Sequence, residues 1–342
     1  MLAILADDLT GALDSAAPFA ARGLRADIAL ELEAVAQIIT DRPDVISINL
    51  NTREIDADEA RAATAAAISL LPPKTRLFKK VDSRLKGNIV TELDAIPYSR
   101  ALAAPAIPAF DRIVEASHVT GHGIDKPISI ADRFGSHFAR INAPDTRTHV
   151  DMDNALDAAE RDGTDLLIGA RGLAEALADR MTKSALSKVA MIPAGRAIFV
   201  IGSRDPITLT QIAILRAAID LNYVDAPNGH VPAVLKADAA LTLIQATPGS
   251  HAVSPQAVAD ALGEGLKNDL SRHSDTLLLS GGATAEAVMR CLGVSRLHLH
   301  GECLPGLSVA STNCRYIIAK SGGFGHPDTL KIIADMVLRK AR

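Results

Sequence analysis

The chain has 342 residues, 48% of them hydrophobic and 22% charged, which is enough for two globular domains with sizeable cores. A net charge of −4 argues against nucleic acid or an anionic membrane as the main partner, and 3% aromatic residues without tryptophan argue against base stacking. There is no apolar run long enough for a membrane helix, and Asp7-Asp8 interrupts the apolar start before a signal-peptide core could form.

Short apolar strands alternate with alanine-rich helical stretches along nearly the whole chain, a pattern typical of parallel α/β sheets. Residues 110–150 lack this periodicity and are predicted to form hairpins and loops. The other elements predicted for the first half are strand 2–6, helix 11–22, strands 25–32 and 44–51, helix 56–70, strand 76–82, helix 87–95, an extended stretch 100–108, helix 154–161, strand 164–169 and helix 171–181.

The second half repeats the alternation, and Asp205-Pro206 is a good helix start because Asp caps helices and Pro fits their first position. The elements predicted there are strand 197–201, helix 206–220, strand 240–246, helix 254–272, strand 276–280, helix 283–292, strands 296–300 and 314–320, and helix 327–340. We therefore expect an α/β protein of two domains, each a largely parallel sheet flanked by helices, with the active site in the cleft between them. The boundaries predicted are 1–182 for the N-terminal domain, 183–195 for a linker and 196–342 for the C-terminal domain.

Three carboxylates follow the first predicted strand, at Asp7, Asp8 and Asp14. Ligands of open parallel sheets bind at the carboxyl ends of the strands, so these side chains lie where a substrate would bind. Capping the following helix would require only one of them. We therefore favour a role in binding a hydroxyl group or a metal ion over capping alone.

Residues 78–88 carry charges where a strand covered on both faces should be apolar. If the strand continues, Lys80, Asp82 and Arg84 point to one side of it. One interpretation is an ion-pair patch on an exposed edge. The other, which we favour, is a site for a polyol acid, with cations for a carboxylate or a phosphoryl group and an aspartate for a hydroxyl. Arg53, after another strand, adds a guanidinium suited to carboxylate binding.

Three glycine turns follow predicted strands of the second half, at Gly202-Ser203, at residues 280–284 and at residues 320–325. Glycine lets backbone amides approach an anion closely, and a helix that begins there adds its positive end. The chain has no GxxxxGK[ST] motif, and no GxGxxG follows the first strand of either half, which weakens a dinucleotide interpretation. Together the three turns predict a phosphate site.

The cysteines are three, an odd number that fits reduced thiols, and we expect a cytoplasmic protein. Cys291, His298, His300 and Cys303 lie close together in the sequence, but their spacing matches no zinc pattern. We therefore expect no metal held by cysteine or histidine.

Several of these segments together resemble the four-carbon acid sugar kinase family. The run Asp-Asp-Leu-Thr-Gly-x-x-Asp at 7–14 is similar to the family's N-terminal substrate motif, and residues 79–88 resemble its Lys-Lys-x-Asp-Ser-x-x-Arg-Gly-Asn segment. The segments that resemble its nucleotide-binding elements are Gly202-Ser203, Ser280 to Ala285, Gly301 to Gly306 and Lys320 to Gly325.

This resemblance implies an enzyme that uses ATP and Mg²⁺ to phosphorylate the terminal hydroxyl of threonate, erythronate or an oxo derivative. The residues expected to bind the sugar acid are Asp7, Asp8, Asp14, Arg53 and Ser83. The residues expected to act in catalysis are Lys80 and Arg84 as cations and either Asp82 or Asp8 as the base. The residues expected to bind the nucleotide are Ser203, Gly281, Gly282, Ala283, Thr284, Lys320, Gly322 and Gly323.

Two alternatives from other classes remain open at this point. Ala283 and Gly323 stand where the family has an acid and an asparagine, so a relative that binds nucleotide or sugar acid as a sensor without turnover is one of them. A two-domain NAD-dependent dehydrogenase is the other, although its glycine fingerprint is missing. The partners expected are a small sugar acid and ATP, and the sequence leaves open whether the chain is a monomer or a homodimer.

Overall fold

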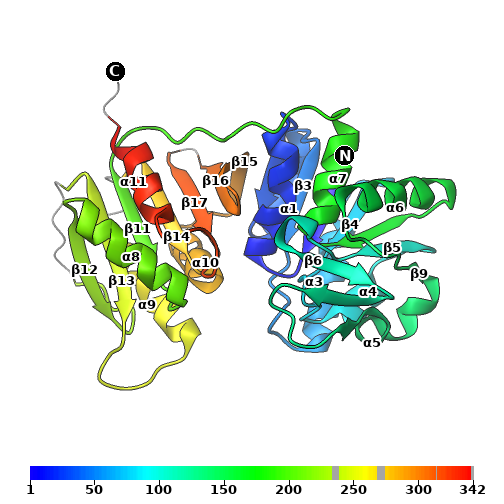
Figure 1. Cartoon of the computed structure of the whole chain (residues 1–342), viewed down its shortest axis with the longest axis horizontal. Coiled ribbons are helices and arrows are strands. Elements are labelled where there is room, and N and C mark those ends of the chain that lie inside the picture. Colours follow the sequence, from blue (N-terminus) through cyan, green and yellow to red (C-terminus); the bar gives the residue numbers. More distant parts are fainter. Residues whose placement is uncertain (233–238, 268–273, 313, 340–342) are drawn as a thin grey trace. The chain divides into compact units, whose positions relative to one another are not determined.

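The computed structural model describes residues 1–232, 239–267, 274–312 and 314–339. It consists of two compact units, Met1–Lys188 and Val189–Arg342. Figure 1 shows each unit as a sheet with helices packed on it. The α/β class predicted from the sequence, with a largely parallel sheet in each half, is confirmed.

In the first unit an all-parallel sheet has the strand order β2-β3-β1-β4-β10-β5-β9. Its strands are β1 (Leu2–Ala6), β2 (Ala26–Ala29), β3 (Val45–Asn49), β4 (Arg76–Lys80), β5 (Ala101–Ala104), β9 (Ile141–Asn142) and β10 (Leu166–Gly169). The central strand β1 is fully buried, as expected of a strand with neighbours on both sides and helices on both faces. The chain runs from β1 through β2 to β3 on one side of β1 and then crosses to β4 on the other. The carboxyl ends of these central strands are where open α/β sheets bind ligands.

Helices cover both faces of this sheet. Helix α7 packs against α1 and α6, whereas α4 packs against α3 and α5. The helices of the first unit are α1 (Leu9–Ala21), α2 (Val35–Thr40), α3 (Ala57–Ser69), α4 (Ile89–Ala95), α5 (Ile130–Phe134), α6 (His149–Arg161) and α7 (Arg171–Met181), with 3-10 turns η1 (Leu32–Ala34), η2 (Pro108–Phe110) and η3 (Gly135–Arg140).

A small antiparallel sheet lies within residues 110–150, the stretch predicted to form hairpins and loops. Its strands are β6 (Arg112–Glu115), β7 (His118–Gly121) and β8 (Ile128–Ser129). Strands β6 and β7 form a hairpin in which Arg112 pairs with Gly121. This hairpin is the part of the irregular stretch that bears on the candidate site.

In the second unit the strand order is β12-β13-β11-β14-β17-β16-β15. The first five strands of this order are parallel, and β16 runs antiparallel to β17 and β15. The strands are β11 (Ala197–Ile201), β12 (Asn222–Pro227), β13 (Leu241–Thr247), β14 (Thr276–Ser280), β15 (Arg296–Leu304), β16 (Leu307–Ser311) and β17 (Tyr316–Lys320).

The helices of the second unit also form two pairs, α8 with α11 and α9 with α10. Their bounds are α8 (Pro206–Ala218), α9 (Pro255–Lys267), α10 (Gly282–Cys291) and α11 (Thr329–Leu338). Phe199, Leu278 and Ile318, from neighbouring strands, pack in one core with Leu215 of α8 and Ile333 of α11. The carboxyl ends of the strands, from which the glycine turns extend, are thus supported by a continuous apolar core.

Several predicted boundaries were wrong. Strands β12 and β16 and the short helix α2 were not predicted, and α6 starts at His149 because Thr148 caps it in a reciprocal pair with Asp151. The last residues of predicted helices 254–272 and 327–340 lie outside the described part of the chain.

The largest difference concerns β4, which ends at Lys80 instead of running to residue 82. Oδ2 of Asp82 accepts the N–H of Arg84 at 2.9 Å, and the carbonyl of Asp82 accepts the N–H of Leu85 at 2.8 Å. An aspartate that bonds the backbone two residues on favours a turn over a strand. The expected alternation of Lys80, Asp82 and Arg84 on one strand face is therefore wrong.

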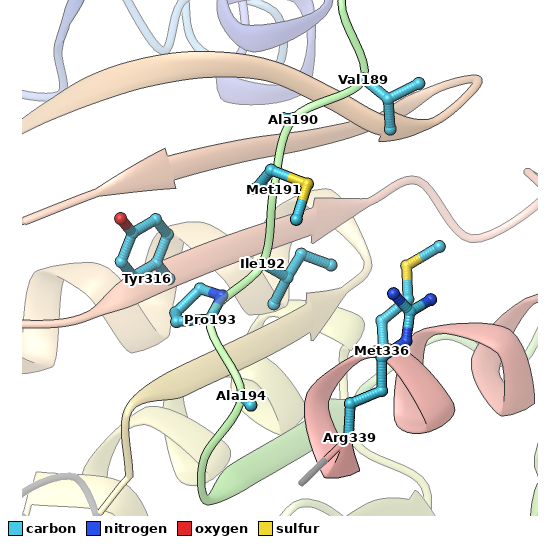
Figure 2. A pocket seen from close by; sticks show the side chains of 9 residues that line it. All are labelled: Val189, Ala190, Met191, Ile192, Pro193, Ala194, Tyr316, Met336 and Arg339. Carbon is cyan, nitrogen blue, oxygen red and sulfur yellow. The ribbon is translucent and has the colours of Figure 1, made fainter. Parts of the chain in front are cut away.

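An apolar cavity of about 580 Å³ lies in the second unit between residues 189–194 and α11 (Figure 2). Tyr316, the first residue of β17, lines it, together with Met336 and Arg339. Because Tyr316 stands at the amino end of its strand, this cavity is distinct from the glycine turns at the carboxyl ends. Within the described residues, no helix has both the length and the apolar character needed to cross a membrane.

Candidate functional site

Charged side chains gather at the carboxyl ends of β1, β3 and β4, which are neighbours in the sheet. The register pairs Ala6 with Asn49 and with Lys80, so the segments that follow the three strands start at the same level. We call this group the charged site. It consists of Asp7, Asp8, Arg53, Lys80, Asp82, Ser83, Arg84 and Arg112.

Asp7, which is buried, and Arg53 form a bidentate ion pair. Arg53 donates from Nε to Oδ2 of Asp7 at 2.8 Å and from Nη2 to Oδ1 at 2.9 Å. Burial would raise the pKa of Asp7, but the charge of Lys79 and the bonds from Arg53 bring that pKa below its ordinary value. A Cβ on Gly87 would lie 3.2 Å from Oδ2 of Asp7, so the absence of a side chain there leaves room for the pair. Asp7 is therefore held ionised and its charge is balanced.

Asp8 is both a helix cap and a member of the charged site. Its Oδ1 accepts the N–H of Gly11 at 2.8 Å, and its Oδ2 accepts the hydroxyl of Thr10 at 2.7 Å and Nη1 of Arg53 at 2.6 Å. The capping interpretation and the functional one thus apply to the same residue. A Cβ on Gly11 would lie 2.6 Å from Oδ1 of Asp8 and 3.0 Å from Nζ of Lys80, so this glycine allows the amine to approach the start of α1.

The two lysines at the end of β4 differ in their partners. Lys79 is fully buried and pairs with Glu92 at 2.9 Å, and Glu92 also accepts the hydroxyl of Thr52, which precedes Arg53. Lys80 is 5% exposed, and its amine has no ion pair or hydrogen bond in the described part of the chain. Lys79 therefore supports the loop that carries Arg53, whereas Lys80 keeps its charge for a ligand.

Asp82, Ser83 and Arg84 lie together in the turn after β4. Arg112, from β6, donates from Nη1 to the hydroxyl of Ser83 at 2.5 Å and from Nη2 to the carbonyl of His122 at 2.9 Å. Oδ1 of Asp82 accepts no hydrogen bond from any residue that the structure describes. Among the residues described, neither Arg84 nor Arg112 forms an ion pair with a carboxylate.

Asp14 is not grouped with these residues. Its carboxylate accepts Nη1 of Arg171 at 2.9 Å, and Nε of Arg171 in turn donates to Glu175 at 2.8 Å. Asp14 thus connects α1 to α7. Its ion pair with Arg171 gives it a structural role, and the substrate contact expected from the sequence stays a prediction.

In the second unit the three glycine turns follow β11, β14 and β17, which are adjacent strands. The register pairs Ile201 with Ser280, and Ser280 with Lys320, so the turns start at the same level of the sheet edge. We call the group Gly202–Ser203, Ser280–Thr284 and Lys320–Gly323 the glycine site.

The turn after β14 places the N-terminus of α10 at the carboxyl ends of these strands. Gly281 has a φ of 109°, which favours glycine, and α10 begins at the next residue. The first-turn amides of Gly282, Ala283 and Thr284 have no acceptor in the described part of the chain, as is usual at a helix start. A Cβ on Gly202 would lie 1.9 Å from the hydroxyl oxygen of Thr284, so β11 and α10 approach closely only because Gly202 lacks a side chain.

Lys320 was expected to contact the nucleotide, but its amine bonds the backbone of its own turn. It donates to the carbonyls of Ser321 at 3.1 Å and Gly322 at 3.0 Å, and to the hydroxyl of Thr208 at 3.1 Å. Burial lowers the pKa of Lys320 to about 8, although the nearby charge of Asp205 acts in the opposite direction. Lys320 therefore shapes the turn from its inner side.

This arrangement sets the direction of the neighbouring amides. The peptides of residues 320–324, like the others in the described part of the chain, are trans, so each N–H points opposite to the preceding carbonyl. Because the carbonyls of Ser321 and Gly322 face Lys320, the amides of Gly322 and Gly323 face the other way. A Cβ on Gly322 would lie 2.3 Å from Oγ of Ser203, which places the Ser203 hydroxyl beside these amides. The result is a concave set of donors fit for an anion.

Four contributors were not predicted from the sequence. Glu92 and Thr208 are polar residues on helices, and the structure buries both of them. In the sequence, the available signal was a polar residue close to apolar ones. Gln211 donates to the carbonyls of Phe324 at 3.1 Å and His326 at 2.8 Å, which ties α8 to the turn after β17. Arg112 reaches the charged site only through the hairpin, which leaves no local pattern.

The Cys/His segment contains no metal-ligand group. In the part of the chain described, no three His, Cys, Asp or Glu side chains are close enough together to hold a metal ion. The rings of His298 and His300 meet edge to face with centroids 5.0 Å apart, and His300 stacks on Tyr316.

Comparison with known proteins identifies both units. Residues 2–130 match the family model of a sugar-binding N-terminal domain, and residues 198–330 match that of a nucleotide-binding C-terminal domain. A D-threonate kinase of Cupriavidus necator is 25% identical over 94% of each chain. The chain belongs to the four-carbon acid sugar kinase family.

Other relatives agree with this assignment. A 3-oxo-tetronate kinase of Actinobacillus succinogenes is 25% identical, over 96% of this chain and 97% of that one. A D-erythronate kinase of Heliobacterium modesticaldum is 36% identical, over 35% of this chain and 29% of that one. The crystal structure of Haemophilus influenzae protein HI1011 has the same fold, with a TM-score of 0.74 at 19% identity, over 99% of this chain and all of that one. As a member of this kinase family, the chain is a phosphotransferase.

Proposed function

We propose that the chain is an ATP-dependent kinase that phosphorylates the terminal (4-) hydroxyl of a four-carbon sugar acid, such as threonate, erythronate or an oxo-tetronate. The observation that carries this proposal is the charge balance of the charged site. Lys80, Arg84 and Arg112 have no carboxylate partner among the described residues, whereas Asp82 keeps one free oxygen. Such a site suits a small molecule that carries both an anionic group and hydroxyls. The names of the relatives support the substrate class.

The glycine site supports ATP as the phosphoryl donor. The helix end at residues 282–284 and the outward amides of Gly322 and Gly323 offer hydrogen bonds and partial positive charge to phosphate oxygens. The match to a nucleotide-binding domain points the same way. Phosphoryl transfer requires the acceptor hydroxyl and the terminal phosphate to lie in line, so both substrates must be held in a fixed orientation.

We assign the magnesium that accompanies ATP to Asp205. Its Oδ1 caps α8 by accepting the N–H of Ile207 at 3.0 Å, and its Oδ2 is beside Gly323, where a Cβ would lie 3.1 Å away. Mg²⁺ is usually held by one or two carboxylates together with substrate phosphates, which fits this donor set. When bound, the ion would neutralise charge on the phosphates.

Asp82 is the better of the two candidates for the base. Three donors already occupy the oxygens of Asp8, whereas Oδ1 of Asp82 has no partner within the described residues and can accept the proton of a hydroxyl. A base must first be within reach of the proton it accepts, and a carboxylate with an unoccupied oxygen meets that requirement more easily.

The test is an assay of ADP release with a panel of four-carbon acids and their oxo forms. We expect turnover by the wild type and a loss of roughly 100-fold or more in kcat for Asp82→Asn, the usual range for a missing general base. Asp157→Asn, which changes an exposed carboxylate paired with Arg180 on α6, is the matched control and should keep wild-type activity. A protein that binds ATP but releases no ADP with any acid would instead be a sensor. A greater loss in Asp8→Asn, with acid binding retained, would move the role of base to Asp8.

A further inference from the structure

The β6–β7 hairpin brings an arginine to the charged site from a distant part of the chain. Nη1 of Arg112 bonds the hydroxyl of Ser83, which lies 29 positions earlier. Nε and Nη2 of Arg112 both donate to the carbonyl of His122, at 3.3 Å and 2.9 Å. The guanidinium is thus oriented by its own hairpin and joined to the turn after β4.

Arg84 and Arg112 lie side by side at this point. A Cβ on Gly123 would be 2.9 Å from Nη2 of Arg84 and 3.2 Å from Nη2 of Arg112, so both guanidinium groups lie beside the same glycine. Gly123 has a φ of 73°, a backbone conformation that side-chain-bearing residues rarely adopt. Burial lowers the pKa of Arg112 and the charge of Arg84 lowers it further, whereas the nearby charge of Asp82 acts in the opposite direction. Two like charges held together in this way favour the binding of an anion.

Two other arginines of the same unit differ from these, because each is balanced by carboxylates. Arg53 binds Asp7 and Asp8, and Arg171 binds Asp14 and Glu175. Arg53 was expected to bind the carboxylate of the substrate, but two carboxylates of the protein already balance its charge. The anion of the substrate therefore has a better partner in the other two arginines.

Ser83 adds a donor to the same place. Its hydroxyl oxygen accepts a hydrogen bond from Arg112, so its hydrogen remains available, and no acceptor for it is recorded among the described residues. The residue is 8% exposed, which limits competition from water. A carboxylate has two oxygens and can accept several such bonds at once.

We propose, on the basis of the proposed function, that Arg84 and Arg112 together bind the carboxylate of the sugar acid, with the Ser83 hydroxyl as a further donor. The hairpin then determines the specificity of the enzyme for a four-carbon acid over the uncharged analogue of the same length. Guanidinium groups match the planar carboxylate in shape as well as charge, which a lysine would not do.

The decisive experiment compares Arg112→Gln with wild type on the preferred acid and on its primary amide, which keeps the hydroxyls and removes the charge. We expect the KM for the acid to rise roughly 10- to 100-fold, as for the loss of a hydrogen bond to a charged group, and kcat/KM for the amide to stay unchanged. Calorimetry with the acid alone, without ATP, should show the same loss of affinity. Arg147→Gln, in which an exposed arginine paired with Glu115 is neutralised, is the control.

Arg84→Gln repeats the test at an exposed position, so the proposal stays falsifiable even if Arg112→Gln fails to fold. Arg112→Lys should recover only part of the affinity, since lysine keeps the positive charge but lacks the paired N–H donors of the guanidinium. Equal losses of kcat/KM on the acid and on the amide would overturn the proposal. A loss in kcat with unchanged affinity for the acid would also overturn it, because the arginines would then act on the phosphoryl group. Absence of ADP release by the wild type would count against the proposed function alone, because calorimetry still measures whether these arginines bind the acid.

Discussion

The amine of Lys320 shows how a buried cation can shape a glycine turn from its inner side. It draws two carbonyls inward, and the trans peptides then direct the amides of Gly322 and Gly323 outward. Thr208 and Gln211, both on α8, hold the same turn by further hydrogen bonds. The donors of the glycine site are therefore oriented before any nucleotide arrives, which lowers the entropic cost of binding it.

The stability of this turn should depend on pH. The pKa of Lys320 is about 8 in the folded chain against an ordinary value of 10.5, so between these values the unfolded chain binds more protons. The free energy of unfolding must then rise with pH over this interval, and below it the buried charge lowers stability by a constant amount. We expect the unfolding free energy of the wild type, relative to that of Lys320→Met, to rise by about 3 kcal/mol from pH ~8 to pH ~10.5. Urea unfolding at several pH values measures this, and a difference independent of pH would contradict it.

Residue types could be predicted from the sequence more readily than their partners. Asp7, Asp8 and Lys80 stand out because charges follow buried strands, and the parallel sheet brings their strand ends together. The sequence does not show that Arg53 is neutralised by two of these acids, or that Asp14 is bound by Arg171, since both pairs depend on contacts between distant segments. Which charges are free for a ligand is a property of the folded chain.

The same limit applies to whole elements. Alternating strands and helices identify the α/β fold because buried parallel strands must be apolar. Strand β12 was missed because it is an edge strand, and its sequence includes an aspartate and a proline and is only partly buried. Strand β16 was missed because a tight turn at Pro305-Gly306 joins it to β15 with no helix between them. Edge strands and strands joined by tight turns therefore leave weak patterns in the sequence.

At the start of α10 the backbone conformation of Gly281 can be tested directly. Alanine at a φ of 109° is strained, so we expect Gly281→Ala to lose about 1–3 kcal/mol of stability and to displace the first-turn amides. The KM for ATP should rise at least about 10-fold, because 1.4 kcal/mol of lost binding corresponds to that factor, while the affinity for the acid stays unchanged. Steady-state kinetics with each substrate varied in turn provides the measurement.

The same helix offers the control. Gly293 follows the end of α10 with a φ of 66°, and a Cβ there would meet nothing within 4 Å. Gly293→Ala should therefore lose some stability through backbone strain but leave the KM for ATP unchanged. If both variants raised the KM for ATP equally, the effect would come from the stability of α10 and not from the amides at its start.

At the scale of the whole molecule, each unit has its own sheet, its own core and one of the two candidate sites. The charged site is built entirely from residues of the first unit, and the glycine site entirely from the second. A division of this kind allows each substrate to be recognised by a separate fold. Interactions that order the reactants account for much of the catalysis in phosphoryl transfer, so under the proposed function each site orders one reactant.

This division predicts separate footprints for the two ligands in hydrogen exchange. A ligand that binds only the folded state stabilises it by about 2.7 kcal/mol at a concentration of 100 times its Kd, which slows exchange through the corresponding opening roughly 100-fold. We expect the sugar acid alone to protect residues 7–11, 80–87 and the β6–β7 hairpin. ATP–Mg²⁺ alone should protect residues 202–205, 281–285 and 320–325. Arg112→Gln should lose the protection by the acid and keep that by ATP. Protection of residues 281–285 by the acid alone would show that the assignment of one ligand to each unit is wrong.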